Sequence, residues 1–225
     1  MKAIIFDAST LISLAMNGLF EEFKELKKLF NGRFIITKEV YGEVVEKPIK
    51  GKRFQFEALR MKQLVDLKIL EMPSVFGIKD SEISNKTKEI LNVANSSFIG
   101  KGKEIHLIDL GEASVLALSN ILSKKKIQSV AAVDERTTRM MCEKPDNLVE
   151  LLQRKLHVKV KAKKENFEQF IKCGIIRSSE LVYMMWKKKI IKLKDPRLLD
   201  SLLWAVKLRG CAISDLEIKE IKRLG

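Results

Sequence analysis

Cysteine and histidine are scarce in this sequence. Its three cysteines, Cys142, Cys173 and Cys211, lie far apart without a C-x-x-C motif, and its two histidines are His106 and His157. An odd number of scattered cysteines argues against a disulfide framework and against a cysteine zinc site, and it favours a reducing compartment. Two histidines are too few for a histidine-rich metal centre.

Long apolar segments and a glycine-rich phosphate loop are also missing. No apolar run approaches the ~20 residues needed to cross a bilayer. Asp7 interrupts the apolar segment near the N-terminus, which is unlike a secretory signal. We therefore expect a cytoplasmic protein without membrane contact, and nucleotide hydrolysis of the P-loop type is not supported. Hydrophobic residues still make up 46% of the 225 residues, which is enough for a sizeable core.

Positive charge is abundant, and the net charge is +14. Residues 123–225 hold 25 Lys and Arg against 13 Asp and Glu, whereas residues 1–122 hold 18 against 16. Such an excess indicates a polyanionic partner, because each neutralised phosphate releases counterions. The alternative is a lysine-rich surface that only promotes solubility.

Apolar runs typical of strands alternate with amphipathic stretches typical of helices. We predict strands at 3–6, 33–37, 68–72, 129–133 and 157–162, and helices at 10–30, 38–47, 54–66, 82–97, 110–124 and 135–143. This alternation predicts an α/β fold with three layers (α/β/α) around a central, mainly parallel sheet of about five strands. The alternating segment 157–162 suits a sheet edge with one face in water.

The chain is predicted to have two parts. Residues 1–164 form the α/β core, with a surface loop at 98–104 and a helical insertion at about 144–157. Residues 165–225 form a C-terminal helical part packed on the core.

Helices of the C-terminal part are predicted at 165–173, 178–190 and 196–209. Its large apolar side chains are expected in the core or, alternatively, on a dimer surface: Met184, Met185, Trp186 and Trp204.

Carboxylates directly follow two predicted strands, Asp7 after 3–6 and Asp134 after 129–133. Parallel α/β sheets bind ligands at the carboxyl ends of their strands, so both residues are candidates for one site. Each also has a structural alternative, since an aspartate in this position can cap the following helix by accepting a backbone N–H.

Three further acids lie on or next to predicted helices. Asp109 and Glu112 form a D-x-x-E pattern before an apolar helix. This pattern is typical of a capping box, but its i, i+3 spacing also places both carboxylates on the same side of the start of the helix, at one end of the fold. Gly111 between them leaves space for a ligand or a close backbone. Glu43 flanks the buried face of the 38–47 helix, so it either reaches inward or is an ordinary solvated glutamate.

Four short motifs, in this order, resemble those of PIN-domain nucleases: "IIFDASTLI", "ITKEVYGEVV", "DLGEASVLAL" and "VAAVDERTTR". The later stretch that begins "GIIRSSELVYMMW" is similar to the C-terminal end of prokaryotic PIN proteins. The resemblance implies an acidic pocket that binds one or two Mg²⁺ or Mn²⁺ ions and hydrolyses RNA. The acidic quartet that it implies is Asp7, Glu43, Glu112 and Asp134. It further implies that Ser9 orients Asp7, and Asp109 supports or replaces Glu112.

Such a pocket needs a cation. Two unit charges ~4 Å apart repel by ~4 kcal/mol at an effective dielectric of ~20, so four carboxylates must be protonated, spread out or neutralised. Oxygen ligands without neighbouring Cys or His favour Mg²⁺ or Mn²⁺ over Zn²⁺. We assign Asp7 and Asp134 as direct ligands, and Glu43 and Glu112 as ligands or as anchors of metal-bound water.

Basic residues around the pocket are expected to bind RNA. Arg136 and Arg139 directly follow Asp134, and Lys187 and Lys188 would extend the same surface. The alternative for each of them is ordinary solvated charge. A homodimer, an antitoxin and another protein partner all remain open.

Two other functions compete with the nuclease. The first is a catalytically inactive PIN-like module that only binds RNA or protein. The second is a haloacid-dehalogenase phosphatase, which also carries an aspartate after its first strand. Phosphatases of that superfamily need a second aspartate two residues later, where this chain has Ser9.

Overall fold

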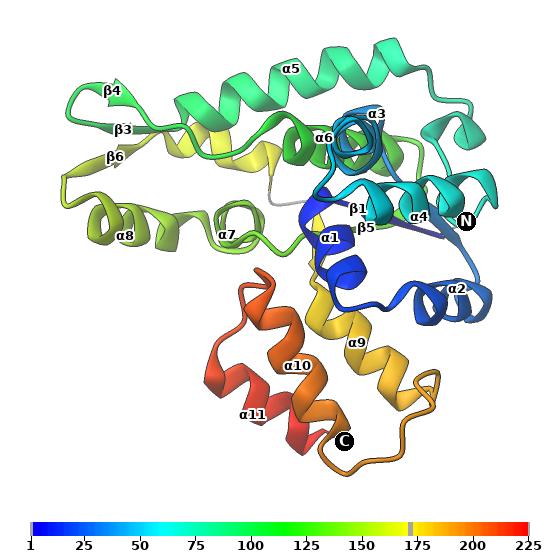
Figure 1. The fold of residues 1–225 in the computed structure, drawn as a ribbon. Coiled ribbons are helices and arrows are strands. Elements are labelled where there is room, and N and C mark those ends of the chain that lie inside the picture. Colours follow the sequence, from blue (N-terminus) through cyan, green and yellow to red (C-terminus); the bar gives the residue numbers. More distant parts are fainter. Residues whose placement is uncertain (1, 171–172, 225) are drawn as a thin grey trace.

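The computed structural model describes residues 2–170 and 173–224, which adopt a mixed α/β fold (Figure 1). Four parallel strands form the larger sheet in the order β2-β1-β5-β7, and three antiparallel strands form a smaller sheet in the order β4-β3-β6. The strands are β1 (Lys2–Phe6), β2 (Arg33–Ile35), β3 (Phe98–Gly100), β4 (Lys103–Glu104), β5 (Gln128–Ala132), β6 (Val160–Ala162) and β7 (Gly174–Ile176).

Helices make up most of the remaining chain. The α-helices are α1 (Ala8–Met16), α2 (Phe20–Leu29), α3 (Lys38–Tyr41), α4 (Gln55–Asp66), α5 (Asp80–Ser96), α6 (Leu110–Lys124), α7 (Arg136–Glu143), α8 (Pro145–Leu156), α9 (Ser178–Lys187), α10 (Leu198–Leu208) and α11 (Asp215–Arg223). A π-helical turn is η1 (Gly42–Glu46), and the 3₁₀ turns are η2 (Pro48–Lys50), η3 (Pro73–Phe76) and η4 (Lys164–Gln169). Among the described residues, no helix is both long enough and apolar enough to cross a bilayer.

Strand β1 lies inside the larger sheet, with β2 and β5 as its neighbours. Ile4, Ile5 and Phe6 are buried, as their uninterrupted apolar run predicts for a central strand. Ile5 lies opposite Ile35 of β2 and Ala131 of β5. The prediction of a parallel sheet is confirmed, with four strands. Since the strands are parallel, their carboxyl ends meet at one edge of the sheet.

The placement of segment 157–162 at the edge of the central sheet is wrong. Its residues Val160–Ala162 form β6, which pairs with β3 in the smaller sheet. Segment 98–104, predicted as a surface loop, forms the β3–β4 hairpin. The reason is a second apolar core, in which Phe98 and Val160 are buried. Alternation identifies a half-buried strand, but it does not specify which sheet the strand joins.

The C-terminal part is not purely helical. Gly174–Ile176 forms β7, which pairs with β5 and completes the larger sheet. Three residues are too few to show a strand period in the sequence. Of the helix predicted at 165–173, only the 3₁₀ turn η4 is found before residue 170, and residues 171–172 lie outside the described residues.

Two other predictions also need correction. Segment 68–72 forms no strand, and its sheet contact is a single bridge between Ile35 and Glu71. The helix predicted at 10–30 is divided into α1 and α2, because Gly18 between them adopts the left-handed φ of 74° that interrupts a helix.

Helices α9, α10 and α11 lie together below the larger sheet in the view of Figure 1. Met185 is buried and Trp186 packs partly buried against the main core, as predicted. Met184 and Trp204 are exposed, so the core position predicted for them is wrong, whereas the alternative of a dimer surface stays a prediction. The Nζ of Lys207 lies 4.5 Å from the centre of the Trp204 ring and covers part of that ring.

Candidate metal and active site

Asp7 stands at the point where β1 ends and α1 begins. Its backbone N–H donates to the carbonyl of Ala132 at 3.0 Å, which continues the pairing of β1 with β5. Its Oδ2 accepts hydrogen bonds from the backbone N–H of Ser9 (3.0 Å) and from the Ser9 hydroxyl (2.5 Å). Asp7 therefore caps α1, and its carboxylate is also buried at the carboxyl edge of the sheet.

Asp134 follows β5 at the same edge. Its Oδ1 accepts a hydrogen bond from the backbone N–H of Ser178 at 2.7 Å. Among the described residues, no group meets hydrogen-bond geometry to its buried Oδ2, but the side chains of Ser178 and Cys211 lie near enough to the carboxylate to lower its pKa against the effect of burial. The backbone N–H of Asp134 donates to the hydroxyl of Ser9 at 3.3 Å. Ser9 thus contacts both aspartates, which fits the supporting role that the resemblance implies for it.

Glu112 lies in the first turn of α6 and reaches toward α7. Its Oε2 accepts the backbone N–H of Asp109 (2.9 Å), and its Oε1 accepts the hydroxyl of Thr138 (2.7 Å). The pKa of Glu112 is raised to about 7. Burial is the largest cause and the negative charge of Asp7 adds to it, whereas the two hydrogen bonds act in the opposite direction.

Asp109 has a different environment from Glu112. Its side chain is 81% exposed, and Oδ1 lies 2.9 Å from Nε2 of His106. Of the two acids in the D-x-x-E pattern, Glu112 is therefore the one that is partly buried.

Glu43 lies on the π-helical turn η1, where the backbone N–H of Lys47 donates to the carbonyl of Gly42 at 2.9 Å. Such turns are rare and often occur at functional sites. Burial raises the pKa of Glu43, and the charge of Asp7 adds to this effect. A Cβ atom at Gly111 would lie 2.8 Å from Oε1 of Glu43. The space left by Gly111 is thus filled by Glu43, which brings this acid against the start of α6.

Glu135 is an acid of the site that the sequence reasoning missed. Its Oε2 accepts the backbone N–H of Thr138 at 2.8 Å and caps α7. Its charge also raises the pKa of Asp7 and of Glu112. The available signal was its position next to Asp134, three residues before a threonine on the following helix.

The four predicted acids share one electrostatic environment. Burial is the largest cause that raises the pKa of Asp7 and of Asp134, and the charge of Asp7 raises the pKa of Glu43, Glu112 and Asp134. Within the described ranges, none of the four forms an ion pair with Lys, Arg or His. The carboxylates therefore act on one another electrostatically, and the cation whose charge offsets part of this effect at Glu43 is Lys47.

This environment predicts an unusual pH dependence of stability. The folded pKa of Glu112, about 7, exceeds the ordinary value of 4.5, so the folded state binds this proton more tightly between those pH values. The free energy of unfolding of the metal-free protein should fall as pH rises from about 5 to above 7, by up to roughly 3 kcal/mol. Urea denaturation in EDTA at pH 5.5, 6.5 and 7.5 measures it.

Glu112→Gln is the matched control for this prediction, because it keeps the shape of the side chain and removes its titration. The variant should lose much less stability over the same pH range. A wild-type profile as flat as that of the variant would contradict the prediction. The range stays above pH 5 because the pKa of Glu217 is lowered to about 2, so its own contribution to stability is lost only at more acidic pH.

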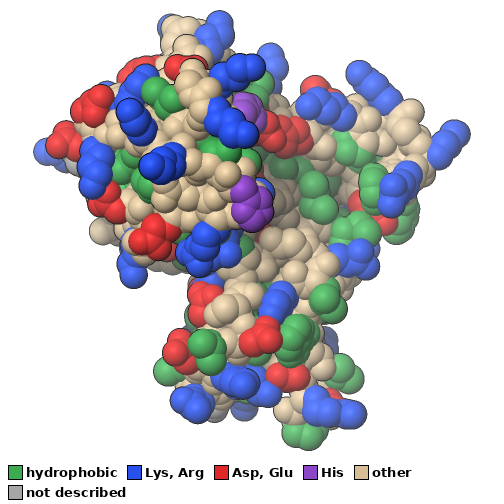
Figure 2. All heavy atoms as spheres, turned by 90° about the vertical axis from the view of Figure 1, so that its left-hand side faces the viewer, with side chains coloured by type: hydrophobic (Ala, Val, Ile, Leu, Met, Phe, Trp, Pro, Cys, Tyr) green, Lys and Arg blue, Asp and Glu red, His purple; other side chains and the backbone are tan. Residues whose placement is uncertain are grey.

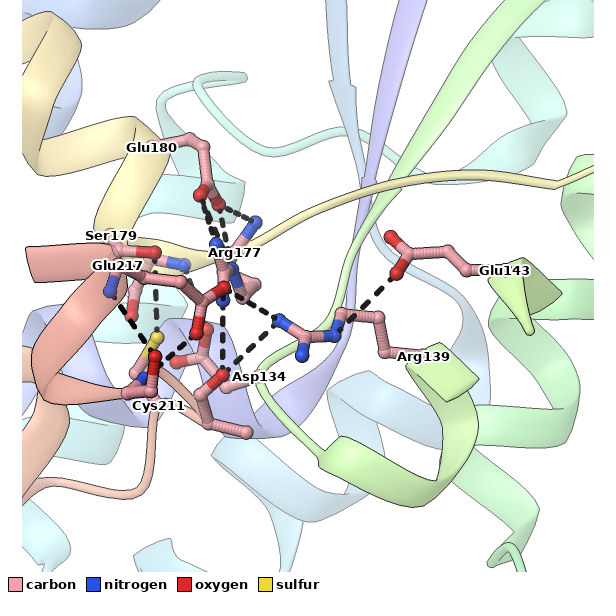
Figure 3. Close-up of polar contacts among 11 residues, drawn as sticks. Asp134, Arg139, Glu143, Arg177, Ser179, Glu180, Cys211 and Glu217 are labelled. Carbon is pink, nitrogen blue, oxygen red and sulfur yellow. Dashed lines mark hydrogen bonds and ion pairs between the residues drawn. The ribbon is translucent and has the colours of Figure 1, made fainter. Parts of the chain in front are cut away.

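Arg177 connects the C-terminal helices to the segment that carries Asp134 (Figure 3). Its guanidinium donates to Glu180 (shortest distance 2.6 Å), to Glu217 (2.8 Å) and to the carbonyl of Ala212 (3.0 Å). Burial alone would lower its pKa, and the two carboxylates raise it instead. The backbone N–H of Ala212 in turn donates to the carbonyl of Asp134 at 3.0 Å.

The four predicted RNA-binding residues lie in two different places. Arg136 and Arg139 lie on α7 and line a cavity of about 530 Å³ near Arg177. Arg136 is exposed, whereas Arg139 donates to the carbonyl of Ala212 at 3.2 Å and lies 3.9 Å from Glu217. Arg139 is thus already part of the internal network.

Lys187 and Lys188 are not brought together with the acids. They lie at the C-terminal end of α9, whose first residue, Ser178, is the one that contacts Asp134. A ten-residue helix is about 15 Å long, and this length separates the two lysines from the acidic site.

The donor set fits Mg²⁺ or Mn²⁺ in its chemistry. All candidate donors are carboxylate oxygens, and the buried Oδ2 of Asp134 accepts no well-formed hydrogen bond within the described ranges. Among the described residues, no three Asp, Glu, His or Cys side chains are already arranged around one position for an ion. Both oxygens of Glu112 and one of Asp134 are instead held by hydrogen bonds from the protein.

Comparison with known proteins adds no family. No protein-family model matches this chain, and no curated protein or solved structure matches it.

Proposed function

We propose that this protein is a divalent-metal-dependent endoribonuclease of the PIN type, with its parallel sheet as the middle of three layers. The observation that carries the proposal is the acidic cluster at the carboxyl edge of the sheet, in which the buried carboxylates of Asp7 and Asp134 form no ion pair within the described part of the chain. Buried charges are costly unless they are paired or coordinate a metal. The order of the four motifs along the chain agrees with this proposal.

Asp7 and Asp134 would hold the metal directly, because each is fixed at the end of a strand. Glu43 and Glu112 would complete the site as ligands or through water. A bound Mg²⁺ or Mn²⁺ supplies an activated water and stabilises charge on the phosphate. Glu112, whose pKa is about 7, is suited to accept or return a proton near neutral pH. Ser9 would fix the positions of Asp7 and Asp134 relative to each other through its hydrogen bonds to both residues.

The charge distribution supports RNA as the substrate. Figure 2 shows Lys and Arg side chains on both sides of a hollow, with acidic side chains at its edge. Basic surfaces on both sides of the hollow attract the phosphate backbone. A homodimer and an antitoxin or other protein partner remain proposals without a contact in the structure that identifies them.

Metal-dependent cleavage tests the proposed function. Purified protein is incubated with a structured and with a single-stranded RNA in Mn²⁺, Mg²⁺ or EDTA, and Mn²⁺ is titrated into the protein by calorimetry. We expect Mn²⁺ binding, and cleavage that EDTA abolishes. Mn²⁺ binding without cleavage of either RNA would leave the metal site and reject these substrates. Absence of Mn²⁺ binding would reject the nuclease and favour the inactive PIN-like module.

A further inference from the structure

A basic and aromatic segment lies beside Glu43 and is not used by the proposed metal site. Within residues 47–60 the exposed cationic side chains are Lys47, Lys50, Lys52 and Arg53. Among the described residues, none of these four forms an ion pair. The segment also exposes two aromatic rings, Phe54 (41%) and Phe56 (67%).

An apolar recess connects this segment to the acidic site. It has a volume of about 100 Å³, and Glu43 and Phe54 are both among its lining residues. Ile12 of α1 and Met61 of α4 supply other parts of its wall. At ~30 Å³ per water molecule, the recess offers the space of about three waters, which suits the edge of one flat ring. Glu43 is therefore shared between the acidic cluster and the recess.

The combination of groups identifies the class of ligand. Four unpaired cations attract an anion, but the recess itself is apolar and does not suit a phosphate. A nucleotide in a single strand satisfies both conditions, since its base offers a flat apolar face and its phosphates remain outside. The guanidinium of Arg53 lies 4.9 Å from the centre of the Phe54 ring. Arg and Phe side chains together are typical stacking partners of unpaired bases.

Duplex RNA does not fit the same features. Its bases are stacked on one another and present only their edges, so an exposed aromatic ring gains no stacking partner. A protein partner would use the apolar recess but would have to supply acids against Lys47, Lys50, Lys52 and Arg53. In RNA, every nucleotide carries both an aromatic base and a negatively charged phosphate.

We propose that residues 47–60 and the recess beside Glu43 form a binding site for single-stranded RNA. One unpaired base packs against Phe54, and the flanking phosphates lie on Lys50, Lys52 and Arg53. The inference deepens the proposed function, because a strand held here passes Glu43 next to the acidic cluster. Binding itself requires no metal and no cleavage.

Fluorescence anisotropy tests the site with the full chain in EDTA. The probes are a fluorescein-labelled ten-nucleotide single-stranded RNA and a labelled hairpin whose loop is short. Phe54→Ala should weaken binding of the single strand by about tenfold, the effect of losing one stacked base. Binding of the hairpin should change much less. Phe54→Leu keeps apolar volume without a ring and should be nearly as weak as Phe54→Ala.

The cations are tested by the salt dependence of binding. Replacing Lys50, Lys52 and Arg53 together by alanine should reduce the slope of log K against log salt by about 2, at ~0.7 per phosphate contact on a single strand. The matched control replaces Lys124, Lys125 and Lys126 by alanine. It removes the same charge at the opposite end of α6, so it should leave the slope nearly unchanged.

Several outcomes would overturn the inference. Equal affinity of Phe54→Ala and wild type for the single strand would exclude stacking, and equal losses in the two triple variants would show only general charge attraction. If Phe54→Ala converts a dimer into a monomer in light scattering without changing RNA affinity, the surface is a protein interface. Mn²⁺ titration of the same variants separates this inference from the proposed metal site. If the variants bind Mn²⁺ and RNA as wild type does, the RNA-binding site is rejected and the metal site is retained.

Discussion

Asp7→Asn is expected to abolish Mn²⁺ binding and to reduce RNA cleavage by at least about 10³-fold, while the protein stays folded. The metal contributes several kcal/mol to stabilisation of the transition state, and each 1.36 kcal/mol is tenfold in rate. Asp134→Asn should act in the same direction. The asparagine oxygen at position 7 still accepts the hydrogen bonds that Ser9 donates to Oδ2 of Asp7.

The thermal stability of Asp7→Asn should not fall with its activity. The carboxylate of Asp7 is buried, and burial raises its pKa, so its charged form is costly in the metal-free protein. Replacing it by a neutral amide of the same shape should maintain or raise the melting temperature in EDTA at pH 8. In contrast, Mn²⁺ should raise the melting temperature of wild type only.

Asp66→Asn serves as the control for this experiment, since Asp66 is a surface residue at the end of α4 that pairs with Lys62. It should retain cleavage and Mn²⁺ binding. If Asp7→Asn unfolds the protein, the aspartate is mainly a structural cap; if cleavage persists at the wild-type rate, the activity comes from another site or from a contaminant.

Arg177→Ala is expected to lower the free energy of unfolding by about 2–4 kcal/mol. The side chain is 11% exposed and makes ionic hydrogen bonds to Glu180 and Glu217. Removing one partner of a buried ion pair costs about 3–5 kcal/mol, because the other charge is left uncompensated. We expect a somewhat smaller loss here, since both carboxylates keep more than a third of their surface in water.

Arg197→Ala is the matched control, and urea denaturation at pH 7 measures both variants. Arg197 also binds a carboxylate with two nitrogens, that of Asp195, but it is 82% exposed. Its removal should cost much less stability than removal of Arg177, because water screens an exposed ion pair. Equal losses in the two variants would show that the Arg177 network adds nothing beyond a surface ion pair. Arg177→Ala should also weaken Mn²⁺ binding, because the network holds Ala212 against Asp134.

Much of the frame of the site could be predicted from the sequence. Asp7 and Asp134 directly follow apolar runs, and parallel pairing of β1 with β5 brings the ends of these runs together. The capping roles were also readable, since Asp7 accepts the N–H of Ser9 and Glu112 accepts the N–H of Asp109. Such local patterns depend on residues within one turn, so the sequence contains all the information that they need.

The partners of the short strands could not be predicted. β6 and β7 have three residues each, and backbone hydrogen bonds favour no particular partner strand. Packing decided the outcome: Val160 of β6 is buried in the second apolar core, and β7 pairs with β5. The expected sheet edge therefore belongs to a different strand from the one that alternation indicated.

In the acidic site, too, some features follow from the local sequence and others only from tertiary packing. By itself, the sequence determined which acids stand at strand and helix ends, because capping and burial patterns act over a few residues. Only the tertiary structure decided that Ser9 joins Asp7 to Asp134, that Glu135 belongs to the site and that Arg139 turns toward Glu217. These contacts join segments that are far apart in the chain. Their geometry follows from how the helices and strands pack, and local sequence preference does not encode it.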